Sequence, residues 1–379
     1  MNVPSKKEAR FFARVSAGLE PLVWGEIERL GEARLLALGH RRVDFAYAGA
    51  TAALLGLRTV DDVYVTVARL NGLDHTRAAL ARLSAKLAAV DFAPALAVVA
   101  AVRALPEYPQ YRVTASHLGR RNYSRYDVEG AVERALTPLL PWRFVLNHPD
   151  EPEPDLDLRV LLEDDWALLG LRLAAAPLHR RDYKQASRPG SLKAPVAASL
   201  LLLAEAPPGA ALLDPACGAG TILAEAWVLD PARVIVGGDL DAESLALAQT
   251  NLDLQGAPAR LAEAAATITP ADEPSGVILY AGDARSVPLP GGSVGAVVSN
   301  LPWGNQAPLA GEVLEVYRAM LGEMARVLAP GGRAVLLTDQ AEAMRAALDD
   351  LAALIPVAEH PISLFGKHPR AYVLVRSVL

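Results

Sequence analysis

The 379-residue sequence contains a single cysteine, which excludes an intrachain disulfide framework and a metal site built from cysteines alone. Its seven histidines are scattered without an HxxxH spacing, and no CxxC motif occurs, so we expect no structural metal. Apolar runs end well before the ~20 residues that a membrane span needs. The N-terminus, MNVPSKKEARFF, lacks the apolar core of a secretory signal. A cytoplasmic protein without a membrane partner is therefore expected.

The sequence also lacks an excess of positive charge. Its formal net charge is −6, whereas nucleic-acid-binding domains are often strongly basic. Two stretches depart from this average: residues 103–125 hold five Arg against one Glu, and residues 178–193 hold three Arg and two Lys against one Asp. Because phosphate attraction is screened within about 10 Å at ordinary salt, a local excess matters more than the total.

The length predicts two or three domains, and the first half of the chain has the pattern of small α+β regions. In residues 1–70 we expect strands at 11–15, 43–47 and 63–70, and helices at 18–30 and 50–57. In residues 71–175 we expect helices at 76–89 and 126–140, strands at 95–102 and 111–116, and a hairpin of 156–162 with 166–173. The acidic, proline-rich segment 147–157 is typical of a loop.

Basic side chains in two connections are candidates for phosphate contacts. The connection HLGRRNYSR, at His117–Arg125, leads into a helix, and guanidinium groups at a helix N-terminus can bind phosphate. A solvated loop is the equal alternative. The turn-rich segment 174–192 contains the expected main domain boundary, and its basic residues either form a linker or line a substrate groove. The candidate residues are Arg120, Arg121, Arg125, Arg180, Arg181, Lys184 and Arg188.

Residues 191–379 alternate helix and strand, which is typical of a doubly wound α/β domain. Ser191 is expected to cap the first helix, with Pro195 in its first turns. Strands are expected at 211–213, 234–238, 277–281, 294–299 and 333–338, helices at 221–229, 242–254, 312–328 and 341–354, and a closing hairpin at 355–364 with 371–375.

The segment 212–226, LLDPACGAGTILAEA, predicts a strand, a glycine-containing loop and a helix. Gly218 and Gly220 allow the backbone to approach a ligand where a Cβ would collide. The next three main strands also end in polar side chains, at Asp239, Asp283 and Asn300. Since ligands of open α/β sheets bind at the carboxyl ends of strands where the strand order changes, we expect these side chains to share one site.

The chemistry of this edge favours a cationic nucleoside. A dinucleotide loop needs a third glycine where this chain has Leu223, and the carboxylates of Asp214, Asp239 and Asp283 would repel a pyrophosphate. They suit the ammonium, sulfonium, ribose hydroxyls and adenine amine of S-adenosylmethionine. The expected cofactor-binding residues are Asp214, Cys217, Gly218, Gly220, Asp239, Asp283, Ala284 and Asn300.

The second half resembles the class I Rossmann-like methyltransferases, with DPACGAGT as the cofactor loop and NLPWG as a segment similar to their N-P-P-aromatic motif. The resemblance implies that Asp239 binds ribose and Asp283 binds the adenine amine. The first half resembles the ferredoxin-like and THUMP modules of RNA-modifying enzymes, through FFARVSAGLEPLVWGEIERLG, YRVTASHLGRRNYSRYDVEGAVERAL and PLHRRDYKQASRPGSLKAP. The implied α/β architecture is a ferredoxin-like unit at 1–70, a THUMP RNA-binding domain at 71–175, a linker at 176–190 and a Rossmann-like methyltransferase domain at 191–379.

Together these features are most similar to THUMP-type tRNA guanine-N2 methyltransferases, and within that group to those acting on the sixth nucleotide of the acceptor stem. The resemblance implies tRNA as the partner and S-adenosylmethionine as the cofactor, and we expect a monomer.

The segment Asn300-Leu301-Pro302-Trp303-Gly304 is the candidate catalytic clamp. The lone pair of an exocyclic amine is delocalised into its ring, so the amide oxygen of Asn300 and the carbonyl of Leu301 could accept both amine hydrogens and direct the nitrogen toward the sulfonium. Pro302 would fix the turn. Trp303 would stack on the extruded base for ~1–3 kcal/mol, against a few kcal/mol for extraction. The alternative is an Asn-capped turn with a buried Trp.

Other interpretations of the same residues stay open. Leu301 replaces the first proline of the usual pair and removes one fixed φ angle. Cys217 could be a nucleophile, but a small packing side chain in the cofactor loop explains it better. The clamp would also suit a protein-glutamine or DNA-adenine methyltransferase, and a degenerate cofactor domain would leave a non-catalytic RNA-binding protein. A thiouridine synthase is disfavoured because no SGGxDS-type loop occurs.

Overall fold

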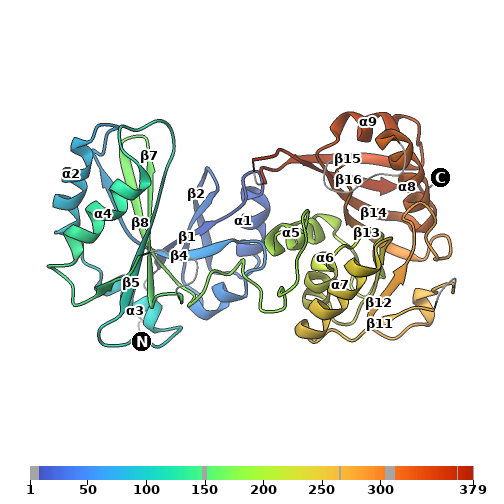
Figure 1. Ribbon diagram of the computed structural model, residues 1–379, viewed down its shortest axis with the longest axis horizontal. Helices are drawn as coiled ribbons and strands as arrows, with labels where there is room; N and C mark the ends of the chain where they lie inside the picture. The colour runs from blue at the N-terminus through green and yellow to red at the C-terminus, as the bar shows by residue number, and fades with distance from the viewer. Residues whose placement is uncertain (1–7, 147–151, 264–265, 304–311, 365, 379) are drawn as a thin grey trace, which may run out of the picture. The chain divides into compact units, whose positions relative to one another are not determined.

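The computed structural model describes residues 8–146, 152–263, 266–303, 312–364 and 366–378. The chain divides into two compact units, one of residues 1–15 and 20–178 and the other of residues 16–19 and 179–379. Each unit contains one eight-stranded sheet (Figure 1). Gly304 of the clamp segment and residues 147–151 of the acidic loop at 147–157 lie outside the described residues.

The N-terminal unit combines one mixed sheet with short helices. Its strands are β1 (Ala9–Arg14), β2 (Ala33–Gly39), β3 (Arg42–Tyr47), β4 (Asp62–Asn71), β5 (Gln110–His117), β6 (Arg143–Phe144), β7 (Leu156–Glu163) and β8 (Trp166–Arg172). Its helices are α1 (Glu20–Glu28), the 3-10 helix η1 (Thr51–Gly56), α2 (Ala78–Leu87), α3 (Ala93–Ala100) and α4 (Arg125–Leu136). The strand order is β2-β3-β1-β4-β8-β7-β5-β6, antiparallel except where β5 pairs with β7 and β6.

Because β4 pairs with both β1 and β8, one sheet runs through the regions expected as separate domains at 1–70 and 71–175. That division stays a prediction. Two helices of this unit, α2 and α4, lie side by side (Figure 1), and Ser84 Oγ donates a 3.1 Å hydrogen bond to the Ala131 carbonyl between them. The N-terminal unit thus consists of one continuous sheet with helices packed against it.

Two expectations for the first half were wrong. The strand expected at 95–102 is the helix α3, because Ala95 and Val99 are buried four residues apart and Pro94 occupies its first turn. The strand β2 was not expected. Most of its side chains are exposed, so the alternation of buried and exposed residues that predicts a half-buried strand is missing.

The C-terminal unit has the alternating pattern that the sequence predicts. Its strands are β9 (Leu212–Asp214), β10 (Val234–Asp239), β11 (Ala259–Leu261), β12 (Gly276–Ala281), β13 (Val294–Asn300), β14 (Leu328–Thr338), β15 (Leu354–Pro361) and β16 (Arg370–Arg376). Its helices are α5 (Ala194–Ala204), α6 (Thr221–Leu229), α7 (Ala242–Gln255), the 3-10 helix η2 (Pro270–Asp272), α8 (Val313–Val327) and α9 (Ala341–Asp349).

The order of this second sheet is β11-β12-β10-β9-β13-β14-β16-β15. Its strands point in one direction except β16, which is antiparallel to both β14 and β15. Helices α6 and α7 lie on one side of the sheet, whereas α8 and α9 lie on the other (Figure 1). Residues of α8 and α9 such as Tyr317, Met324 and Met344 pack with sheet residues in one buried core. The chain passes from β9 to β10 on one side and places β13 on the other, so the strand order reverses at β9.

The beginning of α5 differs from the expectation. The residue before the helix is Lys193, which makes no side-chain cap, and Pro195 lies in the first turn. Ser191 Oγ instead accepts a 3.1 Å hydrogen bond from the Arg188 backbone N–H. Ser191 therefore closes a turn of the preceding segment and is not the helix cap.

Neither a membrane span nor a metal cluster appears in the part of the chain that the structure describes. Among those residues no helix is both long and apolar enough to cross a bilayer. The same residues include no group of three or more His, Cys, Asp or Glu side chains placed to hold a metal ion.

Two glycines of the N-terminal unit should respond in opposite ways to alanine substitution. A Cβ at Gly170 would lie 2.3 Å from the Phe12 ring, so Gly170→Ala should destabilise the protein by about 1–3 kcal/mol. A Cβ at Gly25 in α1 would meet nothing within 4 Å, so Gly25→Ala should stabilise it by up to about 1 kcal/mol. Midpoints of thermal unfolding check both changes, and equal shifts would contradict this difference in packing.

Candidate active site

Four polar side chains meet at the carboxyl edge of the second sheet, as the sequence predicts. Asp214 ends β9 beside Gly237 of β10, Asp239 ends β10 beside Ala281 of β12, and Asp283 follows two residues later. Asn300 ends β13, the neighbour of β9 on its other side. These strands are adjacent and parallel, and the strand order reverses at β9, which is where open α/β sheets bind ligands in a crevice.

The loop between β9 and α6 is shaped by two glycines with left-handed backbones. Gly218 has φ of 53°, and a Cβ placed on it would meet nothing within 4 Å, so the space beside it is open to a ligand. Gly220 has φ of 74° and packs so closely on α7 that a Cβ would lie 3.0 Å from Ala248 Cβ. The glycines therefore serve different purposes, since Gly218 borders the crevice and Gly220 seats α6 against α7.

Asp239 joins this loop to the end of β10. Its Oδ2 accepts a 2.8 Å hydrogen bond from the Gly218 N–H, and its Oδ1 accepts a 2.9 Å bond from the Asp241 N–H. A carboxylate offers about four acceptor positions, so capacity for ribose hydroxyls is left. The ribose role of Asp239 stays a prediction that this geometry permits.

Asp214 lies beneath the loop and is almost completely buried. Its Oδ1 accepts hydrogen bonds from Ser299 Oγ at 2.7 Å and from the Ala216 N–H at 3.2 Å. Burial raises the pKa of Asp214 to about 7, although these hydrogen bonds favour the ionised form. Asp214 thus ties β9 to β13 and brings a carboxyl group close to ionisation at neutral pH to the floor of the crevice.

Asp283 has a partner that the sequence did not indicate. Arg285 Nε lies 2.9 Å from Asp283 Oδ2, and the Arg285 N–H donates to Oδ1 at 2.8 Å. The Arg285 guanidinium lowers the pKa of this half-exposed carboxyl. A role in binding the adenine amine stays a prediction, in which Asp283 would share its oxygens with Arg285. Ala284 beside it is buried.

Cys217 packs in the cofactor loop and is not placed as a nucleophile. Its backbone N–H donates a 2.8 Å hydrogen bond to the Gly238 carbonyl, and its side chain is buried. Burial raises the pKa of the thiol well above its usual range, which disfavours the reactive thiolate.

The side-chain amide of Asn300 is oriented by the segment that precedes α5. Its Nδ2 donates to the Gly190 carbonyl at 3.3 Å. Since a carbonyl can only accept, this contact settles which end of the amide is the nitrogen. The other end, Oδ1, is buried without a hydrogen-bond partner among the described residues. A buried acceptor without a donor is uncommon and marks a position where a ligand N–H would be stabilised.

Hydrogen bonds with β14 and α8 hold the two residues after Asn300. The Leu301 N–H donates to the Leu337 carbonyl at 3.0 Å, and its side chain is buried. Tyr317 Oη on α8 donates to the Pro302 carbonyl at 2.9 Å and lies 2.7 Å from Thr338 Oγ1. Thr338 Oγ1 also accepts from the Gln340 N–H at 2.9 Å. No pattern in the sequence marks Tyr317 for this role, because it occupies an ordinary buried position of an amphipathic helix.

This set of hydrogen bonds has only one possible direction. Tyr317 has a single hydroxyl hydrogen, and the Pro302 carbonyl can only accept it, so Thr338 must donate to Tyr317. The chain of donors runs from Gln340 through Thr338 and Tyr317 to Pro302. It occupies the Pro302 carbonyl, whereas none of the described residues donates to the Leu301 carbonyl, which is the second acceptor of the predicted clamp.

Trp303 is buried, with 7% of its surface exposed, and its indole N–H has no partner among the described residues. Lys367 Nζ lies 5.1 Å from the centre of its ring and 3.5 Å from Asp339 Oδ2. Stacking of Trp303 on a base stays a prediction. At this exposure the ring is covered, as in the alternative of a buried Trp, so stacking would require that cover to open.

The segment expected as a linker is packed onto the C-terminal unit. Arg181 Nε and Tyr183 Oη donate to the buried carboxylate of Glu225, at 3.1 and 2.8 Å. Asn251 bonds both backbone groups of Ala186, with its Oδ1 3.1 Å from the N–H and its Nδ2 2.9 Å from the carbonyl. The boundary of the compact units falls just before His179, at the beginning of this segment.

These contacts change the interpretation of three candidate RNA-binding residues. Arg181 is used by Glu225, and Lys184 Nζ donates to the Leu192 carbonyl while burial lowers its pKa to about 8. Arg188 pairs with Asp241 and contacts Ser244. We therefore assign Arg181 and Lys184 to the packing of the segment, and Arg188 to its pairing with α7 through Ser244 and the capping Asp241. Arg180 is exposed and keeps its predicted role as a candidate.

The basic connection in the N-terminal unit is also partly structural. Arg121 donates to the carbonyls of Leu73 and Asp164 at 3.1 and 2.9 Å, so it braces two loops. Arg120 is exposed, and the exposed Arg125 guanidinium lies 4.7 Å from the ring centre of Tyr126. Arg120 and Arg125 stay candidates for RNA contact, whereas Arg121 is explained by packing.

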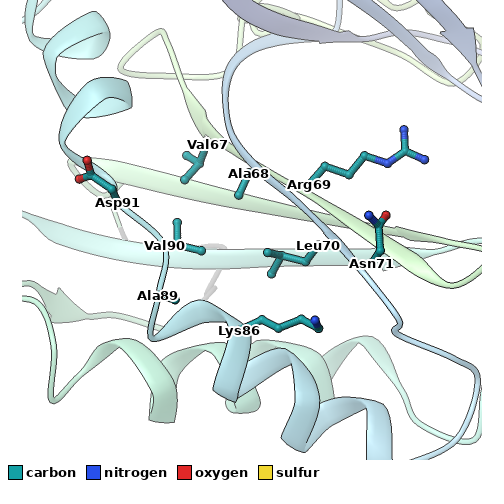
Figure 2. Close-up of a pocket in the computed structure, with 9 residues that line it drawn as sticks. All are labelled: Val67, Ala68, Arg69, Leu70, Asn71, Lys86, Ala89, Val90 and Asp91. Carbon is teal, nitrogen blue, oxygen red and sulfur yellow. The ribbon is translucent and has the colours of Figure 1, made fainter.

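A hollow of about 620 Å³ lies between the second half of β4 and the end of α2 (Figure 2). Val67, Leu70 and Val90 supply its apolar lining, and Arg69 and Lys86 line it as well. The Arg69 guanidinium lies 4.0 Å from the centre of the Trp166 ring. None of the residues predicted for the cofactor or the clamp belongs to it.

The sequence matches a family of known proteins. The family described as RMKL-like, methyltransferase domain, matches residues 181–354. The tRNA (guanine(6)-N2)-methyltransferase of Thermus thermophilus is 32% identical over 265 residues, which are 70% of this chain and 72% of that protein. The chain belongs to the RMKL-like methyltransferase family. As a member of this family it is a methyltransferase, and S-adenosylmethionine is its cofactor.

Other relatives of this RMKL-like methyltransferase agree with the fold. The crystal structure of TrmN from Thermus thermophilus superposes with a TM-score of 0.76 at 27% identity and covers 97% of this chain and 99% of that one. The U6 snRNA (guanine-N(2))-methyltransferase THUMPD2 of Mus musculus is 30% identical over 191 residues, which are 50% of this chain but only 32% of that protein. The predicted fold, a Rossmann-like methyltransferase domain preceded by an α+β region, is confirmed.

The crevice of this RMKL-like methyltransferase fits the cofactor on its own chemistry. Open space beside Gly218 admits a ligand, and the nearby carboxylates of Asp214 and Asp239 suit a positively charged one. Asp239 and Asp283 would hold the nucleoside, and the Gly218 backbone would lie against it. When bound, S-adenosylmethionine supplies a methyl group on a positively charged sulfur.

The hydroxyl of Tyr317 should matter for turnover more than for cofactor binding. Tyr317→Phe removes the hydrogen bond to the Pro302 carbonyl and should lower kcat about tenfold, ~1.4 kcal/mol, because the clamp loses its fixed position. Tyr372→Phe is the matched control, since the buried Tyr372 hydroxyl has no partner among the described residues. Steady-state kinetics with cofactor titration measures both. Equal losses in the two variants would contradict a positioning role for Tyr317.

Proposed function

We propose that this methyltransferase transfers a methyl group from S-adenosylmethionine to the exocyclic N2 of a guanosine in tRNA, at the sixth nucleotide of the acceptor stem. The observation that carries the proposal is the buried Asn300 Oδ1, an acceptor without a donor among the described residues, at the end of β13 beside the strand that carries Asp214. The substrate is supported by the Thermus thermophilus relative, whose name specifies guanine 6 of tRNA.

The clamp residues account for the chemistry of an exocyclic amine. Asn300 Oδ1 and the Leu301 carbonyl would accept the two amine hydrogens, which turns the nitrogen lone pair out of conjugation and toward the cofactor. The Gly190 carbonyl keeps the Asn300 amide from rotating, and Tyr317 keeps Pro302 in place. Rate enhancement then comes mainly from alignment of the acceptor nitrogen, because a neutral sulfur leaves without the help of an acid.

Extraction of a guanine from a stem requires a few kcal/mol, which contacts elsewhere must supply. Trp303 stands next to the clamp, and base stacking on an aromatic ring contributes ~1–3 kcal/mol. Contacts of the N-terminal unit with RNA phosphates would supply the rest. Because part of the extraction energy would come from phosphate contacts, an RNA is favoured over a free nucleoside as the substrate.

Other amines would fit the same clamp, so the substrate must be tested directly. The wild-type chain should be incubated with labelled cofactor and, separately, with unmodified tRNA, U6 snRNA, ribosomal RNA, DNA and a glutamine-containing protein substrate. Label should enter tRNA and appear as N2-methylguanosine at one position by mass-spectrometric mapping. Label in U6 snRNA alone would move the proposal to the substrate named for the Mus musculus relative, and label only in DNA or protein would overturn it.

Asn300→Ala separates catalysis from cofactor binding. The variant loses the acceptor of the clamp but none of the residues that border Gly218, so turnover should fall at least 100-fold while cofactor affinity stays within about twofold. Calorimetric titration of S-adenosylmethionine and single-turnover methylation measure the two quantities. The exposed Asn71 of the N-terminal unit offers a control, since Asn71→Ala should change neither. A parallel loss of binding and turnover in Asn300→Ala would make Asn300 structural.

A further inference from the structure

One face of the N-terminal sheet carries an unusual number of arginines. Strand register places Arg14 of β1 opposite Arg42 of β3 and opposite Asp62 of β4. The same face continues across the sheet through Tyr64, which pairs with Arg172 of β8. It includes Arg159 of β7, which pairs with Gly170, the next residue of β8 on that face. These side chains therefore point to the same side of one sheet.

Some of these arginines are neutralised by carboxylates. Arg172 pairs with Asp62 and with Asp157, each at 2.8 Å, and Arg112 pairs with Asp157 at 2.8 Å. Arg42 pairs with Asp44 at 2.9 Å and also reaches Glu163 of β7. Burial of such groups without partners would be unfavourable, so these pairs are what an ordinary structural role requires.

Arg14 and Arg159 of this face have no carboxylate partner among the described residues. The Arg41 guanidinium has none there either, although the Arg41 backbone N–H donates to Glu20 Oε1 at 2.8 Å. The acid opposite Arg14 is Asp62, which Arg172 already binds. Arg159 donates only to Ser116 Oγ, at 3.2 Å, and its Nε is buried without a partner in the described part of the chain. The Nε of Arg41, in the turn between β2 and β3, is likewise buried and unpartnered.

The three side chains are partly buried, and Arg41 and Arg159 lie close enough to Arg14 to repel its charge. Burial, followed by the charges of Arg159 and Arg41, lowers the pKa of Arg14 to about 10. A base whose pKa falls on folding makes the folded state less stable at neutral pH, because the unfolded chain holds the same proton more tightly. Arg14 thus opposes folding at neutral pH, unlike the paired arginines beside it.

We propose that Arg14, Arg41 and Arg159 form a phosphate-binding site that contacts the backbone of the RNA substrate. Guanidinium groups match phosphate oxygens through two parallel hydrogen bonds, and an anion would supply both the missing acceptors and the missing negative charge. On the same face of the sheet, Phe12, Tyr64 and Leu161 belong to one buried cluster, which keeps the strands that carry Arg14 and Arg159 rigid. The assignment of the anion to RNA rests on the proposed function.

A phosphate site and a structural role predict opposite effects of neutral substitutions. Arg14→Gln should leave the midpoint of thermal unfolding unchanged or raise it, because a repelled charge is removed. The same variant should weaken binding of unmodified tRNA several-fold and reduce the slope of log affinity against log salt by about 0.7–0.9 for each phosphate that is no longer bound. Arg159→Gln should act in the same way, and the double variant should lower the slope further.

Arg34→Gln is the matched control in the same sheet, since Arg34 is exposed and pairs with Glu8 at 2.7 Å. It should leave the salt dependence of tRNA binding unchanged. Fluorescence anisotropy with labelled tRNA over a series of salt concentrations measures the slopes, and a thermal melt in matched phosphate and chloride buffers measures stability. Phosphate should raise the unfolding midpoint of the wild type more than that of Arg14→Gln.

The outcomes separate this site from the proposed function. If tRNA binds with a slope that Arg14→Gln and Arg159→Gln reduce, but no methyl group is transferred, the site stands and the proposed reaction fails. If methylation occurs and both variants keep the wild-type slope, the site is refuted and the reaction stands. A lowered unfolding midpoint without a change in slope would assign these arginines to packing, and a wild type that does not bind tRNA would refute both.

Discussion

The hydrogen bond from Asn300 to the Gly190 carbonyl is the constraint on which the reactive edge depends. It keeps the amide from rotating and leaves Oδ1 buried without a partner among the described residues, an arrangement that destabilises a protein by about 1–3 kcal/mol. The segment that supplies Gly190 is in turn held by contacts such as Tyr183 with Glu225 and Ala186 with Asn251. Residues 179–193 of the C-terminal unit therefore support the candidate active site, because without their packing the Asn300 amide could rotate and find another partner.

The rest of the clamp shows how stiffness can come from packing as well as from proline. A proline at position 301 would fix φ, and Leu301 does not. Burial of its side chain and its N–H bond to Leu337 restrain the same backbone. The hydrogen bond from Tyr317 then occupies the following carbonyl, that of Pro302, whereas the Leu301 carbonyl has no donor among the described residues. A loop built in this way depends on α8 and β14, so substitutions far from the crevice can change catalysis through Tyr317 or Thr338.

The sequence predicted what depends on position along a strand and missed what depends on distant partners. Asp214, Asp239 and Asn300 could be placed together because parallel strands bring their carboxyl ends to one edge. Tyr317 could not be found, since nothing near it in the sequence indicates that its hydroxyl reaches Pro302. Arg181 and Lys184 looked like an RNA surface because a count of charges does not reveal pairing with Glu225 or burial beside Leu192. The helix α3 was misassigned because a short apolar run fits a strand as well as a buried helix.

Unsatisfied groups are more informative about function than charge totals in this chain. A net charge of −6 disfavours RNA binding only if charges act over the whole molecule, and screening limits them to about 10 Å. The carboxylates around Gly218 can thus favour a cation while the arginines beside Arg14 favour an anion. Both sites contain buried polar atoms without partners in the described part of the chain, Asn300 Oδ1 in one and Arg159 Nε in the other. The amine of the substrate base would complete Asn300 Oδ1 and a backbone phosphate would complete Arg159 Nε, so binding of the RNA substrate should stabilise both units.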